Sequence, residues 1–164
     1  MYYTYYKSPF GDIALTANDQ GLTTLTFINS KRIEDDKAQL NAKNYQDKPE
    51  KFTLVCQQLT EYFSGERKQF DLPLAATGTP FQKKVWQALC AIKQGETKTY
   101  GWLAKKINNE KAVRAVGSAN GANPIALIVP CHRVIGSNGK LTGYAGGLAL
   151  KAKLLMHEGA LFKP

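Results

Sequence analysis

Hydrophobic and polar positions alternate in the first part of the chain as they do in β-strands. Runs rich in Tyr, Thr, Ile and Leu fill residues 1–30, and turn-forming residues interrupt them at 8–12 and at 18–21. We therefore predict a small sheet here. Residues 31–50 mix charges, Asn and Gln without a clear period, so we expect a mobile surface connection.

The period changes to that of a helix after Pro49. Gly65 is placed to end this helix, and Cys56 lies on its apolar face as a core residue. Residues 68–74 predict another extended stretch, and the sequence ATGTP at 76–80 indicates a domain boundary. The apolar residues at helical spacing are Phe52, Val55, Cys56, Leu59, Tyr62 and Phe63.

A second helix is predicted to begin after Thr79. A capping box is formed by the hydroxyl of Thr79 and by Gln82, three residues after the cap, and Pro80 occupies the first helical position. We expect Gly95 to stop the helix and Cys90 to be a small buried residue near its apolar face. That face carries Phe81, Val85, Trp86 and Leu89.

Two short helical segments, residues 99–107 and 111–120, follow around a polar turn at 108–110. This pattern predicts a helix-turn-helix. Small residues fill the second helix, and Arg114 is its one long cation. Two interpretations stay open: a backbone that approaches a narrow groove closely, or a helix made small for packing within the protein.

Charge separates the two halves of the chain. The 164 residues carry a net charge of +9, yet residues 1–79 hold nine Lys and Arg against ten Asp and Glu, whereas residues 80–164 hold 13 against three. The second half, at +10, therefore predicts contact with a polyanion, the alternative being a generally basic surface.

Cysteine and histidine usage restricts the possible cofactors and the compartment. The three cysteines form no disulfide framework, which suits the reducing cytoplasm. Two histidines and no CxxC motif make a structural zinc site a poor interpretation, and we expect no metal and no cofactor. The longest apolar stretch, from Pro124 to Pro130, is too short to cross a bilayer, so no membrane association is expected.

The motif that carries chemistry is Cys131-His132-Arg133, which follows a predicted strand at 125–129. A thiol attacks only as thiolate, and its ordinary pKa of about 8.5 leaves a few per cent ionised at neutral pH. An adjacent imidazole and guanidinium in a basic domain favour that ionised form. A structural cysteine with basic neighbours is the alternative for the bare dipeptide.

Wider sequence context resolves this choice. The segments RAVGSANGANP, PCHRV, GYAGG and LLMHEG occur in this order between residues 114 and 159. They resemble the O6-alkylguanine-DNA alkyltransferases, also called methylated-DNA–protein-cysteine methyltransferases. The resemblance is strong from Thr79 to Gly159 and loose before it. It implies DNA repair in a single turnover, in which Cys131 accepts a methyl or alkyl group from O6-alkylguanine, with O4-alkylthymine as a further substrate in question.

The resemblance also implies roles for individual residues. Cys131 would be the acceptor. His132, acting through a bound water, and Glu158 would deprotonate it. Asn123 would brace the active-site turn. Tyr100 would rotate the phosphate beside the lesion while Arg114 fills the space it leaves, because O6 is unreachable within a stacked base pair. Ala115 and Ser118 of the same helix would contact DNA. The substrate pocket would contain Tyr144, Val134, Ala145 and Asn120, with backbone groups at Cys131, Val134 and Ala145 holding the guanine edge.

One departure concerns position 145, where other members carry Ser and this chain carries Ala. The family's N-terminal zinc ligands, present in some members, have no counterpart. Three other classes compete: a damage sensor that lacks the acceptor cysteine, a cysteine hydrolase using Cys131 and His132, and a transcription factor with an unreactive cysteine. The first conflicts with Cys131 itself, and the third leaves PCHRV unexplained.

The sequence thus predicts an α+β monomer of two domains. Residues 1–78 would form a small sheet-and-helix domain like ribonuclease H, with a supporting role. Residues 79–164 would form a mostly helical, winged-helix-like domain with the helix-turn-helix, which binds double-stranded DNA containing alkylated guanine and carries out the transfer.

Overall fold

The computed structural model describes residues 1–163, and the chain divides between Thr77 and Gly78 into two compact units. The first unit contains a sheet of strand order β3-β2-β1-β4, in which β1–β3 are antiparallel and β4 is parallel to β1. The side chain of Asn18 accepts from the backbone N–H groups of Gln20 and Gly21 at 2.8 and 3.1 Å, which closes the predicted turn. The strands are Tyr2–Ser8, Gly11–Asn18, Gly21–Ile28 and Gln46–Asp47.

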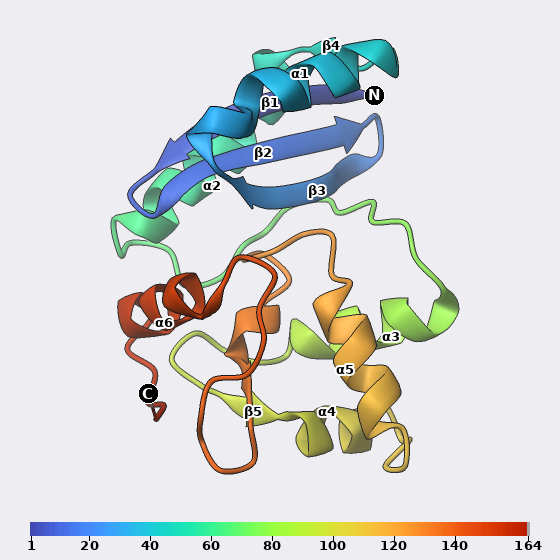
Figure 1. The fold of residues 1–164 in the computed structure, drawn as a ribbon, viewed down its shortest axis with the longest axis vertical. Coiled ribbons are helices and arrows are strands. Elements are labelled where there is room, and N and C mark those ends of the chain that lie inside the picture. The colour runs from blue at the N-terminus through green and yellow to red at the C-terminus, as the bar shows by residue number, and fades with distance from the viewer. Residues whose placement is uncertain (164) are drawn as a thin grey trace. The chain divides into compact units, whose positions relative to one another are not determined.

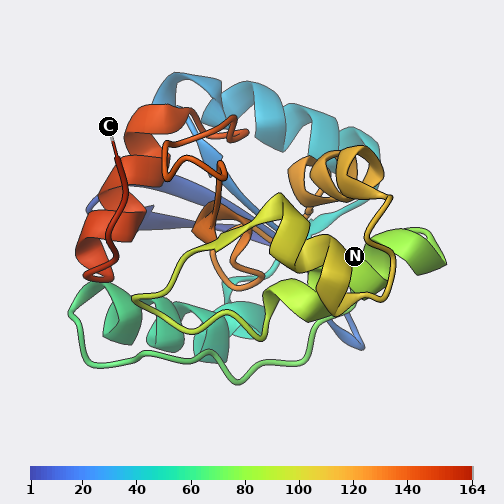
Figure 2. The same ribbon diagram turned by 90° about the horizontal axis from the view of Figure 1, so that it is seen from below.

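Alternation along β1 divides the sheet into two faces, each covered by one helix (Figures 1 and 2). On one face, Tyr6 hydrogen-bonds Thr60 of α2 (Thr53–Phe63) at 2.9 Å. On the other, Tyr3 donates to Asn41 of α1 (Ile33–Ala42) at 2.9 Å. Successive side chains of a strand point to opposite faces of the sheet, and this alternation decides which helix each tyrosine contacts.

The core of this unit lies on the α2 side. The helix follows a 3₁₀ turn at Pro49–Phe52, and Gly65 adopts a φ of +84° just beyond its end, as the sequence indicates. Cys56 is only half-buried, so its assignment to the core is wrong. The buried apolar residues are Ile13, Leu15, Leu25, Phe52, Val55, Leu59 and Tyr62.

Helix α1 corrects the expectation of a mobile connection at 31–50. Its first turn carries Glu34, Asp35 and Asp36, which favour a helix N-terminus. No residue of α1 is buried, and the hydroxyl of Tyr5 donates to Asp36. Because the helix attaches to the sheet by polar contacts, it has no apolar stripe for a sequence pattern to reveal.

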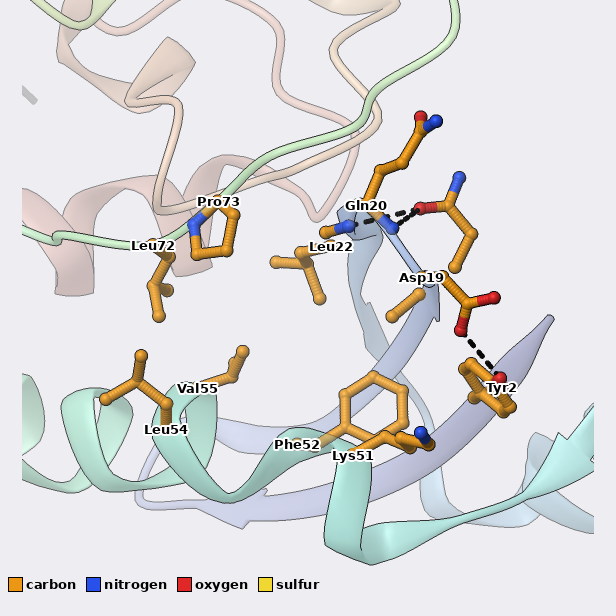
Figure 3. Close-up of a pocket in the computed structure, with 13 residues that line it drawn as sticks. Tyr2, Asp19, Gln20, Leu22, Lys51, Phe52, Leu54, Val55, Leu72 and Pro73 are labelled. Atoms are coloured by element: carbon orange, nitrogen blue, oxygen red, sulfur yellow. Dashed lines mark hydrogen bonds between the residues drawn. The ribbon is translucent and has the colours of Figure 1, made fainter.

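The predicted extended stretch at 68–74 is also not a strand. It pairs with the sheet only in one bridge between Leu22 and Leu74. Beside it lies a cavity of about 320 Å³ with Phe52, Leu54 and Val55 in its lining (Figure 3). The described lining includes no cysteine and no histidine, so this cavity is not a site of thiol chemistry.

The second unit opens with α3 (Pro80–Leu89), and both halves of the Thr79–Gln82 capping box are present. The helix ends at Leu89, before Gly95, which instead adopts a φ of +92° in the following turn. Cys90 caps the helix and is exposed, so the expectation of burial is wrong.

The helix-turn-helix consists of α4 (Tyr100–Lys106) and α5 (Val113–Gly121) (Figure 1). The indole of Trp86 on α3 donates to the carbonyl of Ala119 on α5 at 2.8 Å. A Cβ at Gly117 would lie 3.9 Å from Cδ1 of Tyr100. Such a Cβ would make only ordinary van der Waals contact, so the close packing on the inner side of α5 is carried by the contact between Trp86 and Ala119.

Two short strands and a last helix complete this unit. Strand β5 (Lys98–Thr99) pairs in parallel with β6 (Val134–Ile135), and α6 spans Leu148–His157. The predicted strand at 125–129 is wrong, since Ile125 makes only an isolated bridge, residues 126–128 form a turn and Val129 lies in a bend. No helix among residues 1–163 is long and apolar enough to cross a membrane.

Candidate active site around Cys131

Cys131 begins a 3₁₀ turn, Cys131–Arg133, and is 7% exposed. The preceding turn is fastened by Asn123, whose Nδ2 donates to the carbonyl of Val129 at 2.8 Å. Its Oδ1 accepts from the backbone N–H of Ile125 at 3.0 Å. One amide side chain thus ties both ends of the segment that places the thiol.

Burial raises the pKa of Cys131, and two neighbours oppose it. A hydrogen bond from Asn123 and the positive charge of Lys151 both favour the thiolate. Burial also lowers the pKa of Lys151 to about 8, against the influence of Cys131. The thiol therefore ionises only with the help of specific neighbours, because the solvent does not reach it.

Lys151 is a site residue that the sequence interpretation missed. It is fully buried on α6, and its Nζ donates to the carbonyls of Val134 at 2.7 Å and Thr142 at 3.1 Å. The signal was available: Lys151 stands three and four residues before Leu154 and Leu155, so a lysine occupies the apolar face of a helix.

His132 and Glu158 form a buried pair, with Nε2 2.8 Å from Oε2 and both side chains 0% exposed. Burial raises the pKa of Glu158, but hydrogen bonds and charges from His132 and Arg133 outweigh it and bring the pKa to about 2. Burial lowers the pKa of His132 despite the opposing effect of Glu158. A neutral imidazole beside a carboxylate must donate through Nε2, which leaves Nδ1 as an acceptor.

Arg133 does not act on the thiol as the sequence suggested. Its Nε donates to Oε1 of Glu158 at 2.8 Å, and a further guanidinium nitrogen donates to the carbonyl of Ile92 at 2.7 Å. The guanidinium therefore fixes Glu158 and joins it to the turn that follows α3. The basic group that favours the Cys131 thiolate is Lys151, not the adjacent Arg133.

Three buried polar atoms of the predicted site residues have no hydrogen-bond partner among residues 1–163: His132 Nδ1, Tyr144 Oη and Asn120 Oδ1. Burial raises the pKa of Tyr144 strongly, and the charges of Cys131 and Glu158 raise it further. A Cβ at Gly146 would lie 2.6 Å from Cδ2 of Leu150 and 3.3 Å from Cε2 of Tyr144, so glycine leaves room for both side chains. Unpaired buried acceptors and donors are costly unless a ligand uses them.

The predicted DNA contacts lie on the helix-turn-helix. Arg114, Ala115 and Ser118 are exposed on α5. Tyr100, at the start of α4, is half-buried, and its hydroxyl lies 2.7 Å from Oγ1 of Thr142. The structure therefore leaves the outer side of α5 open, with Arg114 as its long cation.

The backbone groups predicted to hold guanine differ in availability. The N–H of Cys131 donates to the carbonyl of Val129 at 2.8 Å, and the carbonyl of Cys131 accepts from Val134. The carbonyl of Val134 accepts from Lys151. Ala145 is exposed.

No group of three or more His, Cys, Asp or Glu side chains in the described part of the chain is arranged to hold a metal ion. A hollow of about 450 Å³ lies between α3 and the end of α4, with Lys84 and Lys106 in its lining. Cys131 does not line it.

Comparison with known proteins agrees with this geometry. Residues 80–160 match the 6-O-methylguanine DNA methyltransferase DNA-binding domain, and residues 1–76 match the ribonuclease-like domain of the same family. A methylated-DNA–protein-cysteine methyltransferase from Methanosarcina mazei is 53% identical over 96% of this chain and 97% of its own length. The constitutive enzyme of that name from Bacillus subtilis is 44% identical over 99% of this chain and 98% of its own.

Solved structures give the same result. The Mycobacterium tuberculosis OGT in complex with DNA aligns with a TM-score of 0.85 and 43% identity, covering 97% of this chain and 93% of that one. The M. tuberculosis O6-methylguanine methyltransferase aligns with a TM-score of 0.81 and 42% identity, covering 96% and 92%. Both the sheet-and-helix unit and the helical unit are included in these alignments. The chain belongs to the 6-O-methylguanine DNA methyltransferase family.

Proposed function

We propose that this protein repairs DNA by moving a methyl or other alkyl group from O6 of a damaged guanine to the sulfur of Cys131. The observation that carries the proposal is that His132, the residue after the buried Cys131, forms a buried pair with Glu158 in a chain of this family. A cysteine in such a place needs a dedicated base, because burial alone keeps it protonated.

The proposed reaction begins when the thiol proton leaves Cys131 toward Nδ1 of His132, directly or through a water. Glu158 holds Nε2 and stabilises the imidazolium that forms. The thiolate then attacks the alkyl carbon, so that a carbon–sulfur bond forms as the bond from that carbon to O6 breaks. The repaired guanine gains at N1 a proton equivalent to the one that left the thiol. The thioether has no route back to a thiol by simple hydrolysis, so each molecule acts once.

DNA handling is assigned to α4 and α5. The exposed side of α5 would enter the groove with Ala115 and Ser118 against the backbone, since small side chains allow close approach. Arg114 would occupy the place of the extruded nucleotide, and Tyr100 would turn the neighbouring phosphate. Extrusion costs a few kcal/mol, about 2–4, and less for a poorly paired damaged base.

The pocket is assigned to Tyr144, Val134, Ala145 and Asn120. The unpaired hydroxyl of Tyr144 and the unpaired Oδ1 of Asn120 are suited to polar edges of a base. Ala145 offers a backbone N–H without the hydroxyl of a serine. We also propose that the protein works as a monomer in the cytoplasm, where its three free cysteines stay reduced.

Intact-mass measurement after incubation with a duplex containing O6-methylguanine tests this function. The protein should gain the mass of one methylene group, with equal loss of lesion, and peptide mapping should place it on Cys131. Cys131→Ser should abolish the gain and retain DNA binding. Cys90→Ser is the matched control, because Cys90 is the exposed cysteine and random alkylation would favour it.

Other outcomes separate the competing classes. Binding without any mass change would identify a damage sensor or a transcription factor. Repeated turnover without a lasting adduct would identify a hydrolase. Methylation that persists in Cys131→Ser and disappears in Cys90→Ser would refute the assignment of the acceptor.

A further inference from the structure

The segment before Cys131 contains an unusual backbone conformation at Leu127. Its φ is +72°, and it is one of three non-glycine residues with positive φ among residues 1–163. The other two are Asn44 and Asn108, a residue type that often adopts this conformation. Leu127 is 1% exposed, so a bulky, buried side chain occupies a backbone region that L-residues disfavour.

Hydrogen bonding identifies the local structure. The N–H of Ile128 donates to the carbonyl of Ala126 at 2.8 Å, which closes a three-residue ring centred on Leu127. A three-residue turn with positive φ at its centre is the rare and strained form of the γ-turn. Strain of this kind persists only where the surroundings impose it, and it concentrates at functional sites.

A second three-residue turn follows directly. Pro130 has φ −83° and ψ 63°, and the N–H of Cys131 donates to the carbonyl of Val129 at 2.8 Å. These angles are those of the common, relaxed γ-turn. The same carbonyl of Val129 accepts from Asn123, so the position of one oxygen fixes both the backbone of Cys131 and the amide beside its thiol.

We infer that Leu127 is a positioning residue for the alkyl transfer: its strained γ-turn directs the chain so that the Val129 carbonyl meets Asn123 and Cys131 at once. This inference rests on the proposed function. A relaxed backbone at position 127 would let Val129 move, and Asn123 would then lose its hold on the turn and on the thiol. The side chain of Leu127 touches no reacting atom in this scheme and acts only through the turn.

Two variants separate the backbone from the side chain. Leu127→Ala and Leu127→Gly remove nearly the same buried atoms, but only glycine accepts positive φ freely. Leu127→Gly should therefore have the higher melting temperature of the two. The matched control is Leu59 on α2, which is 0% exposed, where Leu59→Gly should melt below Leu59→Ala because glycine disfavours a helix.

Transfer rates test the positioning role. The substrate is the free base O6-benzylguanine, which needs no DNA, and rates are measured in a single turnover at a temperature where every variant is folded. Leu127→Ala should react about tenfold more slowly than Leu127→Gly, within the roughly 100-fold that a small misplacement can cost, because alanine without the leucine packing leaves the positive-φ turn that glycine keeps. Its pH–rate profile should also move to higher pH, because the contact between Asn123 and the thiol is loosened. Leu127→Met, which keeps the bulk and the handedness, should restore the wild-type rate.

The outcomes decide separate points. Equal rates and equal pH profiles for Leu127→Gly and Leu127→Ala would overturn the positioning role, and a Gly variant less stable than the Ala variant would overturn the strain. If neither small variant folds, Leu127→Ile and Leu127→Met are compared instead. Ile is β-branched and tolerates positive φ least, so Leu127→Ile should be the less stable and the slower of the two. Equal stabilities and equal transfer rates for these two variants would refute the inference. A wild-type protein that takes no methyl group from O6-methylguanine in duplex DNA refutes the proposed function, and the order of stabilities still tests the strain.

Discussion

Replacing Glu158 by Gln preserves the shape of the side chain and removes the charge that His132 and Arg133 share. The carboxylate lies 2.8 Å from both partners and its side chain is 0% exposed, so solvent does not compensate for the loss. The variant leaves the guanidinium of Arg133 buried without a counter-charge. Stability and transfer should therefore both fall.

The pKa of Glu158 gives the magnitude. A pKa lowered from 4.5 to about 2 corresponds to about 3 kcal/mol of stability at neutral pH. Loss of one partner from a buried ion pair costs a similar amount, about 3–5 kcal/mol. Since the folded-state pKa is depressed, this contribution is complete above pH 4.5 and is lost as the pH falls toward about 2.

Urea unfolding at pH 7.5 measures the effect. Both tryptophans, Trp86 and Trp102, lie in the second unit, so their fluorescence reports the unit that contains Glu158. With an m-value of about 2 kcal/mol/M, the midpoint should fall by about 1.5 M. As the pH falls below 4.5, wild type should lose stability more steeply than the variant.

Glu61→Gln is the control for this prediction. Its carboxylate lies at the same 2.8 Å from Arg67, but both side chains are 29% exposed, and circular dichroism should register a loss below about 1 kcal/mol. An unchanged midpoint for Glu158→Gln, or a loss no larger than that of Glu61→Gln, would refute the electrostatic reasoning.

Three further predictions concern the reaction. Lys151→Met removes the positive charge that favours the thiolate, so the pH–rate profile of transfer to Cys131 should move to higher pH; an unchanged profile contradicts this role. Arg114→Ala should slow transfer from duplex DNA more than from free O6-benzylguanine in single-turnover assays, and equal slowing counts against extrusion. Affinity for DNA, measured by fluorescence anisotropy, should fall by about 10-fold or more between 50 and 200 mM salt, because the basic half of the chain, residues 80–164, binds phosphates. An affinity that does not depend on salt would exclude binding through phosphate contacts.

Local rules made some elements predictable. The capping box at Thr79 and Gln82, the turn at 18–21 and the helix-turn-helix depend on neighbouring residues only, and the structure confirms each of them. Helix α1 was missed because it buries no residue. Cys90 was misplaced because closeness to an apolar face along the chain does not decide exposure at a helix end.

The site divides in the same way. The motif indicated Cys131 and His132, the family resemblance implied Glu158, and the structure brings His132 and Glu158 into contact across 26 residues. The role expected of Arg133 belongs to Lys151, a residue that the sequence interpretation missed. Sequence adjacency suggested that Arg133 acts on the thiol, but the 3₁₀ turn directs it to Glu158, while α6 carries Lys151 to the reactive centre.

By itself the sequence determined the first three strands, the helices from α2 to α5, the split between a neutral and a strongly basic half, and the family, because these depend on composition, periodicity and short motifs. Only the tertiary structure decided which charges act on Cys131, which polar atoms are left unpaired, and that the chain turns sharply at Leu127. These properties depend on burial and on distances between residues far apart in the chain. A one-dimensional pattern does not contain them, because electrostatic and hydrogen-bond energies are set by position in space.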